Sequence, residues 1–86
     1  MEDLRWNLLK SERLKRTRGA SFEELIQSKV IAVKRHPSNT HQNLLLFEHR
    51  GYIWVVPYVI SGDEAFLKTL YPSRKYTKLY KRGELR

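Results

Sequence analysis

Residues 52–60 form the stretch that most constrains the fold, because they are apolar on both of the faces that a β-strand presents. Tyr52, Trp54, Val56 and Tyr58 alternate with Ile53, Val55 and Val59. Successive side chains of a strand point to opposite sides of its sheet. A strand of this composition therefore has to be covered on both sides. Pro57 has no amide hydrogen, so it predicts a bulge or a missing ladder bond within this strand.

Turn and capping signals predict the elements around this strand. Arg50-Gly51 is a tight hairpin turn, and the predicted strands are 30–34, 44–49, 52–60 and 65–71. The predicted helices are 4–18, 21–29 and a last one from the cap Ser73 to Gly83. The sequence therefore predicts an α+β fold with two N-terminal helices, a four-stranded mostly antiparallel sheet and a C-terminal helix.

A helix stop followed at once by a helix start occupies residues 18–24, Arg-Gly-Ala-Ser-Phe-Glu-Glu. Gly19 can adopt the left-handed conformation that ends a helix. Ser21 can cap the next helix while Glu24 completes a capping box. The pattern predicts a fixed corner between the first two helices.

Length and charge limit what the protein can be. Eighty-six residues are expected to form one domain, 1–86. Lys and Arg total 17 against 9 Asp and Glu, a net charge of +8 that favours RNA, DNA, acidic protein or anionic membrane as partners. The lack of cysteine excludes disulfides and thiolate metal sites, which fits a reducing cytoplasm. With no spanning segment or signal peptide evident, we expect a cytoplasmic protein.

Several motifs resemble the BrnT-like toxins, a group within the RelE/ParE superfamily of bacterial type II toxin–antitoxin systems. They are Trp6, the basic stretch around Lys10, the 18–24 segment, and Pro72-Ser73-Arg74-Lys75 at the start of the last helix. Arg18 stands where the family pattern usually has a histidine. The resemblance implies a RelE-like fold and a metal-independent endoribonuclease that blocks translation. It also implies mRNA as substrate and a cognate antitoxin that neutralises the protein.

Metal-independent RNA cleavage needs a proton acceptor, a stabiliser of phosphate charge and a proton donor. Arg74, at a helix start, suits phosphate binding through its planar fork. His36 is the first choice among three histidines for proton transfer. Lys68 and Tyr71 complete the candidate catalytic residues, although packing is the alternative role for Tyr71 and exposure at the sheet edge for Lys68.

The candidate nucleic-acid contacts are basic side chains near strand ends and on the last helix: Lys34, Arg35, Arg50, Lys75, Lys78 and Lys81. An ordinary amphipathic helix would also place Lys78 and Lys81 on its charged side. No cofactor or metal is expected, because the three histidines lack known ligand spacing.

Two other functions remain open from the sequence. A non-catalytic nucleic-acid-binding domain accounts for the charge equally well. A ParE-like toxin would instead act on a protein target such as gyrase. The choice of a ribonuclease rests on resemblance, since a fold does not determine a function.

Overall fold

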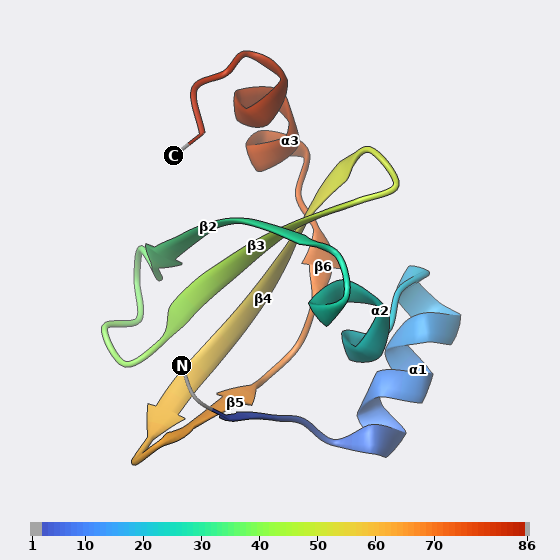
Figure 1. The fold of residues 1–86 in the computed structure, drawn as a ribbon, viewed down its shortest axis with the longest axis vertical. Coiled ribbons are helices and arrows are strands. Elements are labelled where there is room, and N and C mark those ends of the chain that lie inside the picture. Colours follow the sequence, from blue (N-terminus) through green and yellow to red (C-terminus); the bar gives the residue numbers. More distant parts are fainter. Residues whose placement is uncertain (1–2, 86) are drawn as a thin grey trace.

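The strand that is apolar on both faces lies inside a sheet with helices on both sides (Figure 1). The computed structural model describes residues 3–85. Its strands are β1 (Asp3–Arg5), β2 (Lys29–Arg35), β3 (Asn43–His49), β4 (Tyr52–Ser61), β5 (Glu64–Leu67) and β6 (Tyr71–Pro72). Its helices are α1 (Leu8–Arg18), α2 (Phe22–Ile26) and α3 (Arg74–Lys81).

The sheet order is β1-β5-β4-β3-β2, and β6 pairs with the first half of β4. All pairs are antiparallel except β1 with β5, which is parallel. The α+β class and the antiparallel pairing of β2, β3 and β4 in chain order are as predicted.

The predicted four-stranded sheet is wrong, because the described residues form six strands. Leu4 was expected to begin a helix, since it is one turn before Leu8. Instead Leu4 pairs with Ala65 in the sheet, and α1 begins only at Leu8, after Asn7 accepts a hydrogen bond from the Lys10 amide at 2.9 Å. The spacing of the two leucines was therefore coincidental, and Leu8 is 66% exposed.

The predicted strand 65–71 is divided into β5 and β6, and Pro57 accounts for the division. The Pro57 carbonyl accepts a 2.8 Å hydrogen bond from the Lys68 amide, just after β5 ends. The N and C=O of a strand residue face the same neighbour. The proline nitrogen, which has no hydrogen to donate, therefore faces the gap between β5 and β6 and leaves no amide unsatisfied.

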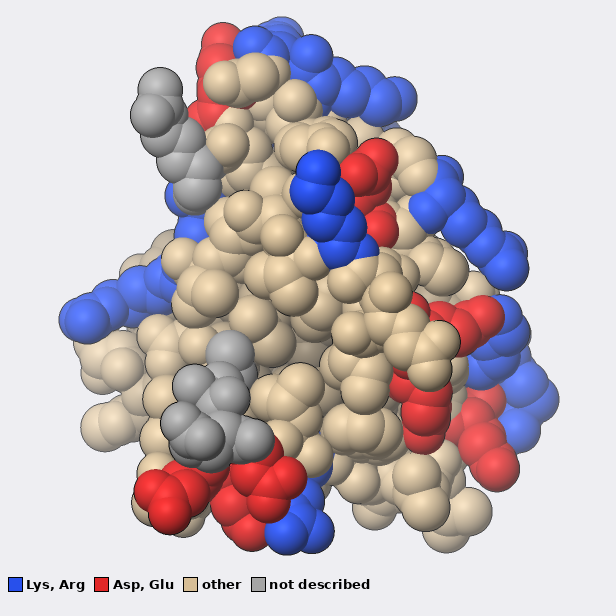
Figure 2. Space-filling model, in the orientation of Figure 1, with Lys and Arg blue, Asp and Glu red and all other residues tan. Residues whose placement is uncertain are grey.

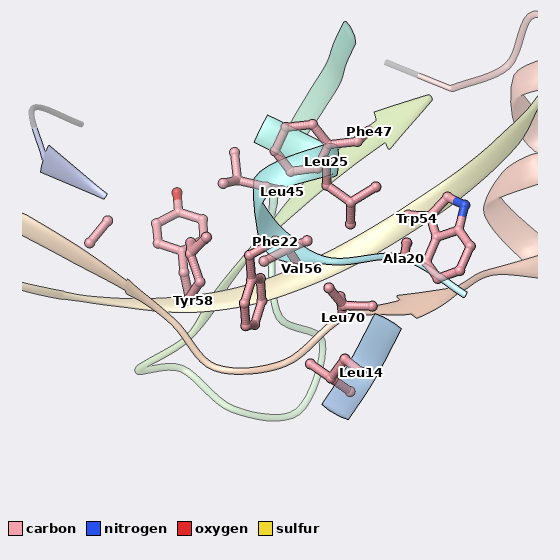
Figure 3. Packing of buried hydrophobic residues seen from close by; sticks show 12 residues of the cluster. Leu14, Ala20, Phe22, Leu25, Leu45, Phe47, Trp54, Val56, Tyr58 and Leu70 are labelled. Carbon is pink, nitrogen blue, oxygen red and sulfur yellow. The ribbon is translucent and has the colours of Figure 1, made fainter. Parts of the chain in front are cut away.

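Side chains of β3 and β4 alternate between two apolar layers. Leu45, Phe47, Trp54 and Val56 lie in the layer covered by α1 and α2, which also contains Tyr58, Leu14, Ala20, Phe22, Leu25 and Leu70 (Figure 3). Leu44, Leu46, Ile53 and Val55 lie in the opposite layer, against which Tyr76 and Tyr80 of α3 pack. The alternation of β4 thus determines that helices are needed on both faces.

The corner between α1 and α2 forms as predicted, although α2 is shorter than residues 21–29. Gly19 ends α1 at a φ of 96°, and Ser21 and Glu24 form the capping box. Glu23 joins the two helices to the N-terminal segment: it accepts hydrogen bonds from Trp6 Nε1 at 2.8 Å and Ser11 Oγ at 2.6 Å. Trp6 and the 18–24 segment, two of the motifs that carried the family resemblance, are therefore joined in one structural unit.

Candidate functional site

Two hydrogen bonds fix the start of α3 to β4, and two more hold Ser73 and Thr77 within the first turn of the helix. The Ser73 amide donates to the Ile53 carbonyl at 2.8 Å, and the Ile53 amide donates to Thr77 Oγ1 at 2.9 Å. Thr77 Oγ1 donates to the Ser73 carbonyl at 2.6 Å, while Ser73 Oγ caps the helix by accepting from the Tyr76 amide at 3.1 Å. Arg74, the first residue of α3, is therefore presented from a rigid base and its side chain is exposed.

Arg74 lies at the end of the sheet where β3 turns into β4, which we call the hairpin end. β6 runs antiparallel to β4 and pairs Tyr71 with Val55 and Pro72 with Trp54, so the chain that follows approaches the start of β4. Arg50 occupies the turn there with a φ of 56° and is exposed. The structure thus places two of the predicted cations at the same end.

Arg18 adds a third cation near this region. Its Nη1 donates a 2.6 Å hydrogen bond to the carbonyl of Leu70, 52 residues further along the chain. This contact places a guanidinium beside the residue that precedes Tyr71. In the sequence Arg18 is a departure from the family pattern, and it was not among the predicted site residues. The one sequence signal for a role of Arg18 was its position directly before Gly19, which ends α1.

Tyr71 is 36% exposed and lies on the sheet face that α3 occupies, because its partner Val55 belongs to that layer. Partial burial raises the pKa of the Tyr71 hydroxyl above its ordinary value of 10.0, and the neighbouring Tyr76 raises it further. A phenol with a raised pKa stays protonated at neutral pH. It can donate a hydrogen bond to a phosphate oxygen but cannot act as a base there.

The basic side chains of α3 are free of acidic partners within residues 3–85. The ion pairs there join Arg5 to Asp3 and Glu64, and Lys15 to Glu24. Lys75 lies with its Nζ 5.5 Å from the centroid of the Tyr76 ring, and Lys78 and Lys81 are exposed. Figure 2 shows Lys and Arg over α3 at the top of the molecule, and both basic and acidic side chains along its right side and at its bottom.

His36, Lys34 and Arg35 are at the other end of the sheet. Arg35 pairs with Asn43, the first residue of β3, whereas the hairpin end begins at His49, the last. Six steps along a strand at about 3.3 Å each separate these ends by about 20 Å. The structure therefore does not bring His36 together with Arg74 in one site.

The hydrogen bonds of His36 also define its tautomer. Its Nδ1 accepts from the amides of Ser38 and Asn39, both at 3.1 Å. An Nδ1 that accepts two hydrogen bonds leaves the ring proton on Nε2 in the neutral imidazole. In this geometry His36 offers a donor, and not a proton acceptor, to a ligand.

His49 is at the hairpin end but is packed inward. Its Nδ1 lies 3.1 Å from Ser28 Oγ, and its ring meets Trp54 edge-on with centroids 6.3 Å apart. Its Nε2 is buried with no hydrogen-bond partner among the residues that the structure describes. His41 lies in the exposed loop between β2 and β3. Neither imidazole is presented beside Arg74.

Lys68 follows β5 and is exposed, with its Nζ 5.2 Å from the centroid of the Phe66 ring. It lies on the same edge of β4 as Tyr71, because β5 and β6 both pair with that edge. A cation over an aromatic face is attracted by the ring quadrupole. Lys68 is therefore exposed at the sheet edge, which was the alternative to a catalytic role in the sequence-based prediction.

The arrangement at the hairpin end is suited to binding phosphate and stabilising its charge. It presents Arg50, Arg74 and Lys75, together with the hydroxyl of Tyr71, and Arg18 is held beside Leu70 from the face that α1 covers. Guanidinium groups pair with two phosphate oxygens at once and stay charged at any working pH. A nearby carboxylate, Glu48, accepts a 3.0 Å hydrogen bond from Tyr80, six residues beyond Arg74 along α3.

Between residues 3 and 85 there is no group of three or more His, Asp or Glu side chains arranged to hold a metal ion. None of the helices in this range is long and apolar enough to cross a membrane.

Comparison with solved structures relates this fold to a toxin. The crystal structure of the Brucella abortus ribonuclease toxin BrnT matches with a TM-score of 0.54 over 85% of this chain and 97% of the toxin chain. The chain has a BrnT-like fold. The two sequences are 15% identical, so the likeness concerns the fold alone. No family model matches the sequence, and no curated protein does.

Proposed function

We propose that this chain is the toxin of a bacterial type II toxin–antitoxin system and acts as a metal-independent endoribonuclease that blocks translation. The observation that carries the proposal is the set of cations around Arg74 at the hairpin end that form no ion pair within residues 3–85, on a fold like that of the ribonuclease toxin BrnT. A net charge of +8 supports an RNA substrate, since phosphate contacts dominate nucleic-acid affinity.

In this proposal Arg74 binds the scissile phosphate and stabilises the charge that develops on it. Tyr71 donates a hydrogen bond from its protonated hydroxyl, and Lys68 lies on the same edge of β4 to contact the substrate. Arg50, Lys75, Lys78 and Lys81 bind neighbouring phosphates. His36 is left out of the catalytic group because of the distance of about 20 Å along β3.

The proposal includes mRNA as substrate, a cognate antitoxin as partner and a cytoplasmic location. It treats residues 1–86 as one toxin-like domain and places the chain in the RelE/ParE superfamily. The fold likeness to a ribonuclease toxin supports the RNA substrate and the antitoxin partner. The superfamily rests on the sequence motifs around Trp6 and residues 18–24.

The test is inducible expression of the chain in bacteria beside Arg74→Ala, with growth and total RNA integrity followed together. We expect growth arrest and RNA loss with the natural sequence and relief of both with Arg74→Ala. Arg13→Ala, which removes an exposed cation from α1, is the matched control and should leave both effects in place. Cleavage of purified RNA in excess chelator tests the metal independence.

A non-catalytic RNA-binding domain is the second candidate, and the histidines favour it. His36 is remote from Arg74, and His49 has its Nε2 buried, so neither supplies a general base beside the phosphate site. RNA binding without cleavage by the purified protein would support this function. Growth arrest with intact RNA would instead indicate a ParE-like action on a protein target such as gyrase.

A further inference from the structure

β2 forms one edge of the sheet and has a neighbouring strand on one side only. It pairs with β3, and the sheet order ends there within residues 3–85. The outward amides and carbonyls of this seven-residue strand are therefore free to pair with an added strand. The other edge strand, β1, has three residues and carries the Arg5–Asp3 ion pair.

One face of β2 carries exposed valines that continue the apolar layer under α2. Val30 pairs with Phe47 and Val33 with Leu45, and both partners are core residues. Yet Val30 is 50% exposed and Val33 is 56% exposed. An extended segment added beside β2 would place alternate side chains against these valines and extend the core.

The opposite face of β2 carries cations. Lys29 pairs with Glu48 across the strands, and Lys34 pairs with Leu44 on the face that α3 occupies. Neither lysine takes part in an ion pair within residues 3–85, and Arg35 adds a further exposed charge at the strand end. Acidic side chains on an added strand would meet Lys29 and Lys34 at close range.

We propose that the β2 edge binds an extended acidic segment of a partner protein by strand addition. The segment alternates apolar residues, which contact Val30 and Val33, with acidic residues, which contact Lys29 and Lys34. The same cations, and the bulge between Val30 and Ala32, oppose pairing of this edge with a second copy of the chain. That the antitoxin supplies this segment rests on the proposed function, whereas the strand addition does not.

The experiment begins with selection of a displayed library of random segments, each about nine residues long, against the whole protein. We expect the enriched segments to alternate apolar and acidic residues. A synthetic copy of the best segment should protect the amides of residues 29–35 from hydrogen exchange. Methylation of its backbone nitrogens should abolish binding, because strand addition depends on main-chain hydrogen bonds.

Two variants of the edge test the contacts. Val33→Glu would place a charge against an apolar residue of the segment, and Lys34→Glu would place two like charges together, so each should weaken segment binding by about tenfold or more. Arg13→Glu makes the same charge change as Lys34→Glu but on α1, and its effect should stay within about twofold.

The proposal is overturned if no segment is enriched, if the enriched segments lack the alternation, or if protection falls outside residues 29–35. If the amides of β2 become protected from hydrogen exchange when the protein alone is concentrated, a second copy of the chain is the occupant, and the proposal is also overturned. Protection of the β2 amides by an RNA oligonucleotide, and by no peptide segment, would overturn the proposal as well. RNA cleavage is measured separately on the same preparations, so a failure of this edge and a failure of the ribonuclease proposal give different results.

Discussion

Trp6 and Glu23 are joined by a 2.8 Å hydrogen bond from the indole Nε1 to Oε2, across 17 residues of chain. Ser11 donates to the other oxygen of the same carboxylate at 2.6 Å and accepts from the amide of Phe22 at 3.0 Å. The N-terminal segment, α1 and α2 therefore share one polar junction, which lies over the apolar layer that contains Phe22.

Ser11→Ala should destabilise the protein. Ser11 is 1% exposed, and its loss removes a donor from Glu23 and leaves the buried Phe22 amide without its acceptor. An unsatisfied buried group of this kind typically costs about 2 kcal/mol. Urea denaturation should show this decrease in the free energy of unfolding. Ser38→Ala, in the exposed loop, is the control, and an equal decrease there would contradict the explanation.

Acid should weaken the same junction. Hydrogen bonds, chiefly that from Ser11, lower the pKa of Glu23 below its ordinary value of 4.5, and Lys15 lowers that of Glu24. The unfolded chain therefore takes up these protons first as the pH falls, so the stabilisation is present above pH 4.5 and is lost as the pH falls through the lower folded values.

The free energy of unfolding measured against pH checks this expectation. Its decline below pH 4.5 should be less steep in Glu23→Gln, which has no carboxylate to protonate at this position. Glu12→Gln removes an exposed carboxylate from the outside of α1 and should leave the profile as it is. An unchanged slope in Glu23→Gln would argue against a role for Glu23 in acid unfolding.

Arg18→Ala should affect both stability and RNA cleavage. It removes the 2.6 Å contact with the Leu70 carbonyl that holds the chain just before Tyr71. Because the site is partly exposed, we expect a loss of about 1 kcal/mol in the free energy of unfolding. RNA cleavage should fall further than in Arg16→Ala, which removes a neighbouring exposed cation. Equal cleavage by the two variants would show that Arg18 is not part of the cleavage site.

Tyr71→Phe should reduce RNA cleavage while the fold is retained. The change removes the hydroxyl, which is kept protonated by its raised pKa, but keeps the ring. A single-turnover cleavage assay should show the loss, and Tyr52→Phe serves as a tyrosine control in β4. If Tyr71→Phe cleaves normally and Tyr71→Ala does not, the ring would be the functional part, as in base stacking.

Much of the fold was predictable because its signals are local. The capping box of Ser21 and Glu24, the turn at Arg50-Gly51 and the cap at Ser73 each depend on a few consecutive residues. The short strand β1 was missed, because its three residues become a strand only by pairing with β5, some 60 residues later. The division of β5 from β6 was missed for a similar reason, since it depends on Pro57 in another strand.

The candidate site was less predictable than the fold. Arg74 and Tyr71 are close in sequence, and the prediction that named both depended on that closeness. His36 was grouped with them for its imidazole and its place after Lys34-Arg35 at a predicted strand end, but the pairing of Arg35 with Asn43 places it at the far end of β3. Arg18 could not be assigned from sequence, because its partner is a backbone carbonyl, and any residue type provides one.

The sequence by itself determined the helix ends, the hairpin turn and a central strand that must be covered on both faces, because backbone preferences and side-chain alternation act over a few residues. Only the tertiary structure decided which cations gather at the hairpin end, which tautomer His36 adopts and which strand is left at the sheet edge. These depend on contacts between distant segments, and such contacts are set by the packing of the whole chain.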